Sequence, residues 1–367
     1  MRKTLLAVLC AVCVLALSMP AGAALKKEYK LSCNLTENTV WGQGASMFAR
    51  LVTERTEGKV NVKAYYSAQL LSGKQSNELL MIRNGTIDFS YAGLGNWSAT
   101  LPATSLFSLP WFISSSGNSD KALDAIMGGK AGAMLREMIA ERGVTLFGTG
   151  HTSPRHFHGN RPLTKPEDFK NLNFRFVAQP IYKDIFGEMG ANGININWSE
   201  AITAYQQGLC DAGENPYNTI IPYRVYEFHK YITDCAYTNS IYCFVANSRV
   251  WNSFDEETRK IITECALEAG TYARMLGNLG LDDGTAYKWL EERDLLPKED
   301  NMVIPRDPLK LLADNGVTVH KSTPEEIMAF RRATKEAFYK HVKIIGEDLV
   351  AAAEDDMRAA GLRVERP

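Results

Sequence analysis

The sequence carries no excess of charge of either sign. Lysine and arginine number 41 against 42 aspartates and glutamates, so the formal net charge is −1 at pH 7. A chain without a basic excess lacks the signature of a nucleic-acid-binding protein, and no cationic helix indicates a membrane surface. Any electrostatic selectivity must therefore reside in a local site.

Cysteine is scarce and irregularly spaced, which argues against a disulfide framework and against a zinc site. Five of the seven cysteines lie beyond residue 23: Cys33, Cys210, Cys235, Cys243 and Cys265. A disulfide between Cys235 and Cys243 is one alternative. We expect instead buried free thiols that pack as small hydrophobic side chains.

The motifs of common hydrolases and nucleotide-binding enzymes are missing. No G-x-S-x-G, H-E-x-x-H or P-loop occurs in the chain. His151, His156 and His158 lie close in sequence, but no carboxylate or cysteine with ligand spacing accompanies them. We therefore expect no metal, no cofactor and no catalytic residue, with the histidines engaged in hydrogen bonds or solvated.

Long apolar runs are absent except at the amino terminus. Arg2 and Lys3 precede an apolar run over 5–17, and Pro20 and the small residues 21–23 follow it. This order is typical of a secretory signal peptide that is cleaved near Ala23. A membrane anchor is the alternative, but the run is short for a span of about 20 residues. We expect an exported mature protein that begins near Ala24.

Helix and strand patterns alternate along the first half of the mature chain. Strands are expected at 29–34, 59–65 and 86–93, and helices at 40–57 and 76–84. In the helix at 40–57, five apolar residues share one face: Val40, Met47, Phe48, Leu51 and Val52. This alternation predicts an α/β fold with a largely parallel sheet, whose ligands bind near the carboxyl ends of the strands.

A second unit begins near residue 150. It contains a strand at 171–177, helices at 181–189 and 198–207, and then the polar stretch AYQQGLCDAGENP at 204–216. We expect a short strand in this stretch, followed by a helix with Pro216 as its first residue and Asn215 as its N-cap. Such helix starts bind anions through free N–H groups, although plain capping is an alternative interpretation.

Several segments in a consistent order carry a family resemblance. They are GKVNVKAYYSAQLLSGKQSNELLMIRNGTIDFSYA, LFSLPWFI, RPLTKPEDFKNLNFRF, MGANGININWSEAITAYQQGLCDAGENP and VANSRVW. Over about residues 28–270 the chain resembles the DctP-type solute-binding proteins of tripartite ATP-independent periplasmic (TRAP) transporters. The resemblance implies a two-domain periplasmic-binding-protein fold, with a ligand cleft between the domains and segments that cross between them.

The resemblance also implies site residues in the second domain. Arg175 matches the arginine that forms the main salt bridge to a substrate carboxylate, and Asn215 completes that site. Independently, Arg175 alternates with Phe174 and Phe176 on a strand, so it faces away from their apolar side.

The resemblance further implies cleft positions for Arg155 and Trp198. A solvated loop arginine is the alternative for Arg155, and packing between the domains is the alternative for Trp198. Tyr237, at the end of the crossing strand YITDCAY, stands where relatives often have a histidine, so this candidate departs from the family pattern.

Four residues of the first domain are further candidates for ligand binding. Glu37 and Asn38 follow the first strand, and Asn96 and Trp97 follow the strand at 86–93. Open α/β sheets bind ligands at such positions. A surface turn is the alternative for Asn96 and Trp97, because each residue alone is a weak signal.

The implied domain limits follow from the same resemblance. Domain I comprises 24–150 and about 236–275, domain II comprises 151–235 and about 276–320, and the C-terminal helices at 321–367 pack across both. The segment 277–320 is longer than the family's usual connection, and we expect a surface elaboration there. The charges of 347–361 are interpreted as the solvated face of an amphipathic helix.

These observations favour a periplasmic solute-binding protein that captures a small organic anion for a TRAP transporter. The aromatic candidates outnumber the cationic ones, which favours a monoanion with a carboxylate or sulfonate head; a dianion is the alternative if Arg155 binds a second anionic group. We expect a monomer with no bound nucleic acid. An exported enzyme on the same fold, or a ligand sensor for a receptor kinase, are alternative functions.

Overall fold

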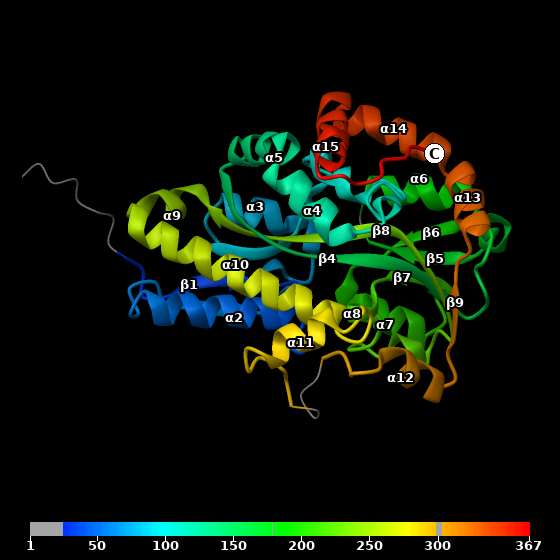
Figure 1. The fold of residues 1–367 in the computed structure, drawn as a ribbon, viewed down its shortest axis with the longest axis horizontal. Coiled ribbons are helices and arrows are strands. Elements are labelled where there is room, and N and C mark those ends of the chain that lie inside the picture. The colour runs from blue at the N-terminus through cyan, green and yellow to red at the C-terminus, as the bar shows by residue number, and fades with distance from the viewer. Residues whose placement is uncertain (1–24, 178, 299–302) are drawn as a thin grey trace, which may run out of the picture.

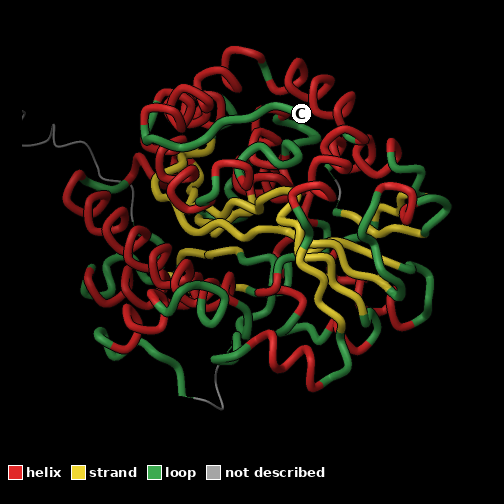
Figure 2. Tube along the Cα trace, turned by 45° about the vertical axis from the view of Figure 1, so that its right-hand side comes forward, coloured by secondary structure: helices red, strands yellow, loops and turns green. Residues whose placement is uncertain are grey.

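The computed structural model describes residues 25–177, 179–298 and 303–367. Its strands form one sheet that runs through the whole molecule (Figures 1 and 2). The strands are β1 (Tyr29–Ser32), β2 (Val62–Tyr65), β3 (Phe89–Gly93), β4 (Val144–Gly159), β5 (Asn173–Phe176), β6 (Asn192–Asn195), β7 (Ala212–Asn215), β8 (Tyr231–Asn247) and β9 (Thr318–Lys321).

The sheet is mixed, so the prediction of a largely parallel sheet is only partly right. The strand order is β2-β1-β3-β8-β4-β7-β5-β6, and β9 pairs with β8 outside this path. Pairs within each end of the sheet are parallel, as β1 with β3 and β5 with β7. The pairs made by β4 with β7 and β8, and by β3 with β8, are antiparallel. The prediction of parallel pairing rests on the alternation of short strands and helices in the first half of the chain. That pattern does not include the two long strands, β4 and β8.

Helices cover both faces of the sheet. They are α2 (Val40–Arg55), α3 (Glu78–Arg83), α4 (Ser119–Gly128), α5 (Lys130–Ala140), α6 (Pro180–Glu188), α7 (Trp198–Gln206), α8 (Tyr217–Ile220), α9 (Ser248–Ser253), α10 (Glu256–Asn278), α11 (Thr285–Glu291), α12 (Pro308–Asp314), α13 (Pro324–Ala333), α14 (Lys335–Ile345) and α15 (Glu347–Ala359). One buried cluster takes side chains from α3 to α6, α14 and α15, and a second takes them from α2, α7, α8 and α10 to α12.

The predicted local elements of the mature chain are confirmed with small shifts at their ends. All five apolar residues expected on the inner face of α2 are buried, because a helical period of 3.6 residues places them on one side. Gly85, with a φ of 79°, follows α3 as the expected stop. On β5, Phe174 and Phe176 belong to the hydrophobic core, while Arg175 faces the opposite side.

Two long strands connect the two domains of the fold. β4 pairs with β7 near one end, β8 pairs with β3 near its other end, and the two strands pair with each other along most of their length. The β4–β8 ladder shifts register at three places, the last between Arg155 and Phe157. Such irregularities bend a strand locally and re-aim its side chains. The crossing segments predicted by the family resemblance are β4 and β8.

The C-terminal helices pack on helices from earlier in the chain. α15 packs on α4 and α5, and α14 packs on α6. Val350 and Met357 of α15 are fully buried, while the acidic residues Asp348 and Asp355 point outward. The numerical limits of the domains stay a prediction, since both core clusters combine residues from the two domains.

All five cysteines beyond residue 23 are free and buried, as expected. Cys235 and Cys243 lie on the same strand, β8, eight residues apart. At about 3.3 Å per residue this separates them by roughly 26 Å, far beyond the reach of a disulfide. Burial raises the pKa of the Cys235 thiol and raises that of Cys243 to about 12. The alternative of a Cys235–Cys243 disulfide is therefore wrong.

The segment 277–320 is built into the core, so its interpretation as a surface elaboration is wrong. It supplies α11 and α12, whose Leu290 and Leu312 are fully buried in the second cluster. It then leads into β9, which pairs in parallel with β8 from Tyr231 onward. The apolar spacing within two short helices was too brief for the sequence to reveal this packing.

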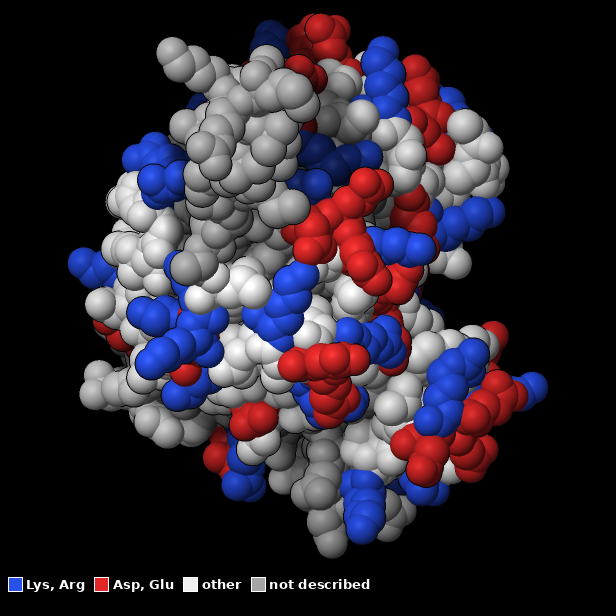
Figure 3. All heavy atoms as spheres, turned by 90° about the vertical axis from the view of Figure 1, so that its left-hand side faces the viewer, with Lys and Arg blue, Asp and Glu red and all other residues white. Residues whose placement is uncertain are grey.

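The outer surface mixes charges of both signs. On the face seen in Figure 3, lysine and arginine side chains lie beside aspartate and glutamate side chains. Among the described residues, no helix has both the length and the apolar character needed to cross a membrane. The balanced surface agrees with the balanced composition.

We expect Leu312→Ala to lower the free energy of unfolding by about 2–5 kcal/mol, because it leaves a cavity in the second cluster. Leu309→Ala on the same helix is the matched control: Leu309 is 45% exposed and should change stability by less than about 0.5 kcal/mol. Urea denaturation followed by circular dichroism measures both. Equal effects of the two substitutions would contradict the buried placement of α12.

Candidate ligand-binding site

A cavity of about 60 Å³, measured as the space open to the centre of a water-sized sphere, lies between the two domains. At about 10–15 Å³ for each water, it holds roughly four to six water-sized groups. The residues that line it come from both domains: Leu35, Trp41, Gln75, Gly93, Gly95, Asn96, Phe107, Ser108, Arg155, Arg175, Val177, Gln179, Trp198, Asn215, Thr219, Asn239, Ser240, Ile241 and Tyr242. The cavity is sized for a small molecule.

The position of the cavity follows from the topology. Gly93, Val177 and Asn215 lie at or just beyond the carboxyl ends of β3, β5 and β7. Loops diverge at such strand ends and leave a crevice, which is where open α/β sheets bind their ligands. The long strands β4 and β8 close the remaining sides with Arg155 and Ile241.

Arg175 is the central cation of this cavity. Its side chain is only 1% exposed, and its Nε and Nη2 donate to the carbonyl of Ile196 at 3.0 and 2.7 Å. Its guanidinium carbon lies 5.3 Å from the centre of the Trp198 ring. Among the described residues no carboxylate pairs with it within 4.0 Å, a separation at which several other arginines of this chain do form ion pairs.

Arg155, on β4, is held very differently. Its Nε donates to Oε2 of Glu214, its Nη2 donates to the Glu214 carbonyl at 2.7 Å, and its Nη1 donates to Oγ of Ser240 at 2.8 Å. Glu214 is fully buried on β7. Burial lowers the pKa of Arg155 but the attraction of Glu214 outweighs it, so that pKa lies well above its usual range. Arg155 therefore lines the cavity as half of an ion pair.

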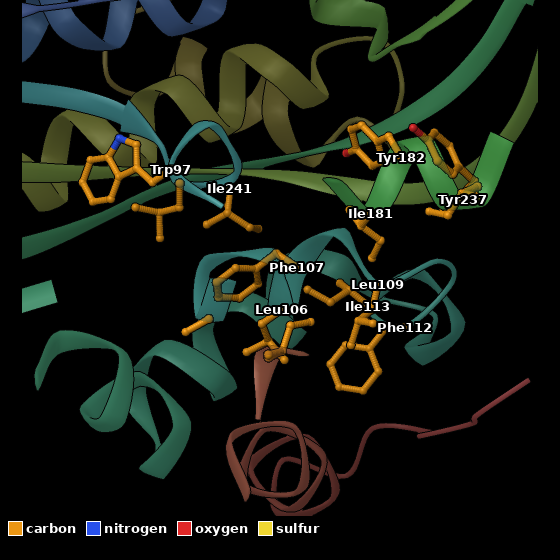
Figure 4. Close-up of a cluster of buried hydrophobic side chains, with 14 of the residues drawn as sticks. Trp97, Leu106, Phe107, Leu109, Phe112, Ile113, Ile181, Tyr182, Tyr237 and Ile241 are labelled. Carbon is orange, nitrogen blue, oxygen red and sulfur yellow. The ribbon is translucent and has the colours of Figure 1, made fainter. Parts of the chain in front are cut away.

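Tyr237 does not line the cavity. It is fully buried, and its hydroxyl donates to the same Glu214 oxygen at 2.9 Å that Arg155 contacts. Figure 4 shows its ring among buried hydrophobic side chains beside Tyr182. The structure thus places Tyr237 behind the site, where it holds the carboxylate of Glu214.

Trp198 forms an aromatic wall at the first residue of α7. Its ring packs edge-on against Tyr223, with 5.0 Å between ring centres. Its backbone N–H donates to Oε1 of Gln75, from the other domain, at 3.4 Å. The predicted start of this helix is confirmed, but Asn197 at the N-cap position makes no side-chain capping bond. The first turn of α7 is instead hydrogen-bonded to Gln75 on the opposite wall of the cavity.

Asn215 lies at the cavity wall and does not cap a helix, so the predicted capping role is wrong. α8 begins at Tyr217, with Pro216 in the N-cap position. Asn215 is still paired within β7, opposite His156, and its side-chain Oδ1 faces Nε2 of His158 at 3.1 Å. The backbone is extended at Pro216, with φ −76° and ψ 159°, and a proline also disfavours the helical conformation for the residue before it, here Asn215.

His158 continues inward to a second histidine. Its Nδ1 lies 2.7 Å from Nδ1 of His229. Burial lowers the pKa of His229 to about 4 and holds that of His158 well below its usual range, and the neighbouring ring adds to the latter shift. Both rings are therefore neutral at pH 7. Neutral His158 donates from Nε2 to the Asn215 oxygen, which leaves the Asn215 amide N–H groups for other acceptors.

The first-domain candidates divide into those on the wall and those away from it. Asn96 lines the cavity. Trp97 is fully buried in the core of Figure 4, where its indole donates to Glu78 at 2.9 Å. Glu37 and Asn38 are exposed, and Glu37 accepts from Ser46. The structure therefore does not bring Trp97, Glu37 or Asn38 to the cavity.

Several wall residues escaped the sequence reasoning. Gln179 comes three residues after the end of β5, and the rule of strand ends could have found it. Its Oε1 accepts from Ser108 at 2.7 Å. A Cβ atom at Gly95 would lie 2.4 Å from Nε2 of Gln179, so a larger residue at this position would require the Gln179 side chain to move. Gln75 could not be predicted as a wall residue from the sequence, because it belongs to no motif or periodic pattern and a single glutamine in a turn is common.

The three histidines of β4 serve separate neighbours. His151 contacts the Tyr91 hydroxyl, His156 pairs with Asp234 at 2.9 Å, and His158 faces Asn215 and His229. In the described part of the chain no group of three or more histidine, cysteine, aspartate or glutamate side chains could hold a metal ion.

We expect stability to fall as pH is lowered from about 6.5 to 4. In this range the unfolded chain binds a proton at His229 that the folded chain does not, which costs about 3 kcal/mol of unfolding free energy. His229→Gln should flatten this pH dependence, measured by urea denaturation at several pH values. His320→Gln, at a half-buried histidine that contacts Glu326, serves as the control; a profile for His229→Gln as steep as that of the unmodified protein would contradict the assignment.

Comparison with known proteins agrees with this geometry. The family model described as bacterial extracellular solute-binding protein, family 7 (DctP), matches residues 31–278. A crystal structure of a TRAP periplasmic solute-binding protein from Ralstonia eutropha, with (S)-2-acetolactate bound, is 32% identical to this chain. It covers 91% of this chain and 99% of its own, with a TM-score of 0.80.

Two curated relatives match over comparable lengths. A solute-binding protein of Roseobacter denitrificans is 28% identical over 281 residues, which are 74% of this chain and 82% of its own. The C4-dicarboxylate-binding periplasmic protein DctP of Rhodobacter capsulatus is 26% identical over 342 residues, or 93% of each chain. With the family model matching well over half of its length, this chain belongs to the DctP family of bacterial extracellular solute-binding proteins, the binding-protein family of TRAP transporters.

Proposed function

We propose that this protein captures a small organic monoanion in the periplasm and hands it to the membrane subunits of a TRAP transporter. The observation that carries the proposal is the guanidinium of Arg175, which is 1% exposed and has no carboxylate partner among the described residues. A buried cation without a counter-ion is costly, and an anionic ligand removes that cost. The carbonyl of Ile196 satisfies two N–H groups and leaves others for a ligand carboxylate or sulfonate.

The walls of the cavity favour one anionic head with a compact, partly apolar body. Trp41, Phe107 and Trp198 supply aromatic surface, and the volume suits a molecule of a few heavy atoms. Among the relatives, one structure holds (S)-2-acetolactate, which carries a single carboxylate, whereas others are named for C4-dicarboxylates. The ion pair of Arg155 with Glu214 favours the first of these ligand classes.

Capture depends on closure of the two domains around the anion. Contacts across the cavity already join Gln75 to Trp198 and Ser108 to Gln179. A ligand that binds this closed form more tightly than an open one shifts the population toward it, by its differential affinity and no further. Excluding water strengthens the attraction between Arg175 and the anion, because the local dielectric falls.

The alternative of an exported enzyme finds little support at the cavity. The nearest carboxylates are already engaged: Glu214 with Arg155, and Asp211 with the backbone of Asn173 and with Asn160. An acid–base catalyst needs a group free to exchange a proton with the ligand. We therefore propose a binding protein without catalysis that acts as a monomer.

We expect Arg175→Ala to weaken binding of (S)-2-acetolactate by at least about a hundredfold, since a buried charge-assisted contact is worth roughly 3 kcal/mol or more. Isothermal titration calorimetry measures the affinity, and circular dichroism verifies the fold. Arg142→Ala, at an exposed position, is the matched control. If no anion in a panel of mono- and dicarboxylates and sulfonates binds the unmodified protein, the proposed function is wrong.

We propose that residues 1–23, which lie outside the described residues, form a signal peptide that is removed on export. Amino-terminal sequencing of the protein from the periplasmic fraction should then give a chain that starts near Ala24. Recovery of the intact amino terminus from the membrane fraction would contradict this.

A further inference from the structure

The two arginines of the cavity differ in how much charge they offer to a ligand. No other described side chain that lines the cavity is charged. Within the described part of the chain, Arg175 contacts a backbone carbonyl and an aromatic ring but no carboxylate, whereas Arg155 contacts both a side-chain and a backbone oxygen of Glu214. Two guanidiniums with one carboxylate leave a single net positive charge at the site.

Glu214 itself is placed behind the wall and not on it. Its side chain is fully buried, and its Oε2 accepts from both Arg155 and Tyr237. Its other oxygen, Oε1, is buried without a hydrogen-bond partner. A carboxylate buried with so few donors depends on the charge of Arg155, and in turn it cancels that charge.

We propose that Glu214 sets the valence of the ligand. It acts as a built-in counter-ion that occupies Arg155, so that the cavity neutralises one anionic group of a ligand and rejects a second. This inference rests on the proposed function of anion capture. A second carboxylate would enter a water-poor cavity without a compensating cation and would also be repelled by Glu214.

The inference makes Glu214 a specificity-determining residue that need not contact the ligand. Removing its charge while keeping its shape should convert Arg155 into a second anion-binding group. Glu214→Gln does this, because the amide oxygen can replace Oε2 as acceptor and the amide nitrogen takes the place of the unpartnered Oε1.

The test measures affinity for a monoanion, (S)-2-acetolactate, and a dianion, succinate, by calorimetry at pH 7.5 and low salt. We expect the unmodified protein to prefer the monoanion. In Glu214→Gln the ratio of succinate affinity to acetolactate affinity should rise at least about tenfold. A preference of the unmodified protein for succinate, or an unchanged ratio in Glu214→Gln, overturns the inference.

Two further variants separate charge from structure. Tyr237→Phe removes a hydrogen bond to the same Glu214 oxygen without changing charge, so its affinity ratio should stay within about threefold of the unmodified protein. The double variant Arg155→Gln with Glu214→Gln again leaves one net positive charge and should restore the monoanion preference. It leaves no unpaired charge beyond that of Arg175, so it should fold even if Glu214→Gln alone does not, and a preference of this variant for succinate overturns the inference.

Failure of this inference is distinguishable from failure of the proposed function. If the unmodified protein binds acetolactate but the double variant acquires the same dianion preference as Glu214→Gln, charge balance does not set the valence and only the inference is lost. If neither ligand nor any other small organic anion binds the unmodified protein, the proposed function falls and the inference with it.

Discussion

Placing a guanidinium where water cannot reach it is the constraint around which this site is organised. Arg175 is positioned by β5, whose neighbours β6 and β7 fix its register on both sides. The carbonyl of Ile196 and the face of Trp198 offset part of the lost hydration, but neither carries a negative charge. No carboxylate of the described residues neutralises this cation, whereas an incoming anion can, so the stability of the protein and its affinity for an anion are coupled through the same group.

The remaining polar groups of the site are arranged so that they do not compete for that cation. Arg155 and Glu214 satisfy each other, with Tyr237 supporting the carboxylate from behind. His158 engages the oxygen of Asn215 and is itself supported by His229. Each of these polar groups is therefore paired with a residue other than Arg175. The pairs extend from the cavity into the core of the second domain.

Much of the fold was accessible from the sequence, because local patterns with strong periodicity dictate their own conformation. The face of α2 and the alternation around Arg175 follow from periods of 3.6 and 2 residues, and the helix stop at Gly85 follows from the left-handed backbone that glycine adopts readily. The antiparallel pairing of β4 and β8 did not follow, since pairing partners far apart in sequence leave no local trace. The core role of α11 and α12 did not follow either, because seven residues are too few to show a clear apolar period.

The site was only partly predictable. Arg175, Arg155, Trp198, Asn215 and Asn96 all line the cavity. Trp97 and Tyr237 lie behind it, because an aromatic residue near a strand end can turn either to the cleft or to the core and the sequence does not distinguish the two. The sequence contains Glu214 but does not show that it pairs with Arg155. The pairing depends on the register between β4 and β7 and so required the three-dimensional structure.

The buried cysteines have a consequence for how the chain responds to oxidants. In the folded protein the thiols of Cys33, Cys210 and the other three cysteines are shielded from solvent, so oxidants in the surrounding solution cannot reach them. In the unfolded chain all five are exposed together, and any disulfide they form is non-native and blocks refolding. The protein therefore resists oxidation only as long as it stays folded. Damage by oxidation should depend on the rate of global unfolding rather than on the concentration of oxidant.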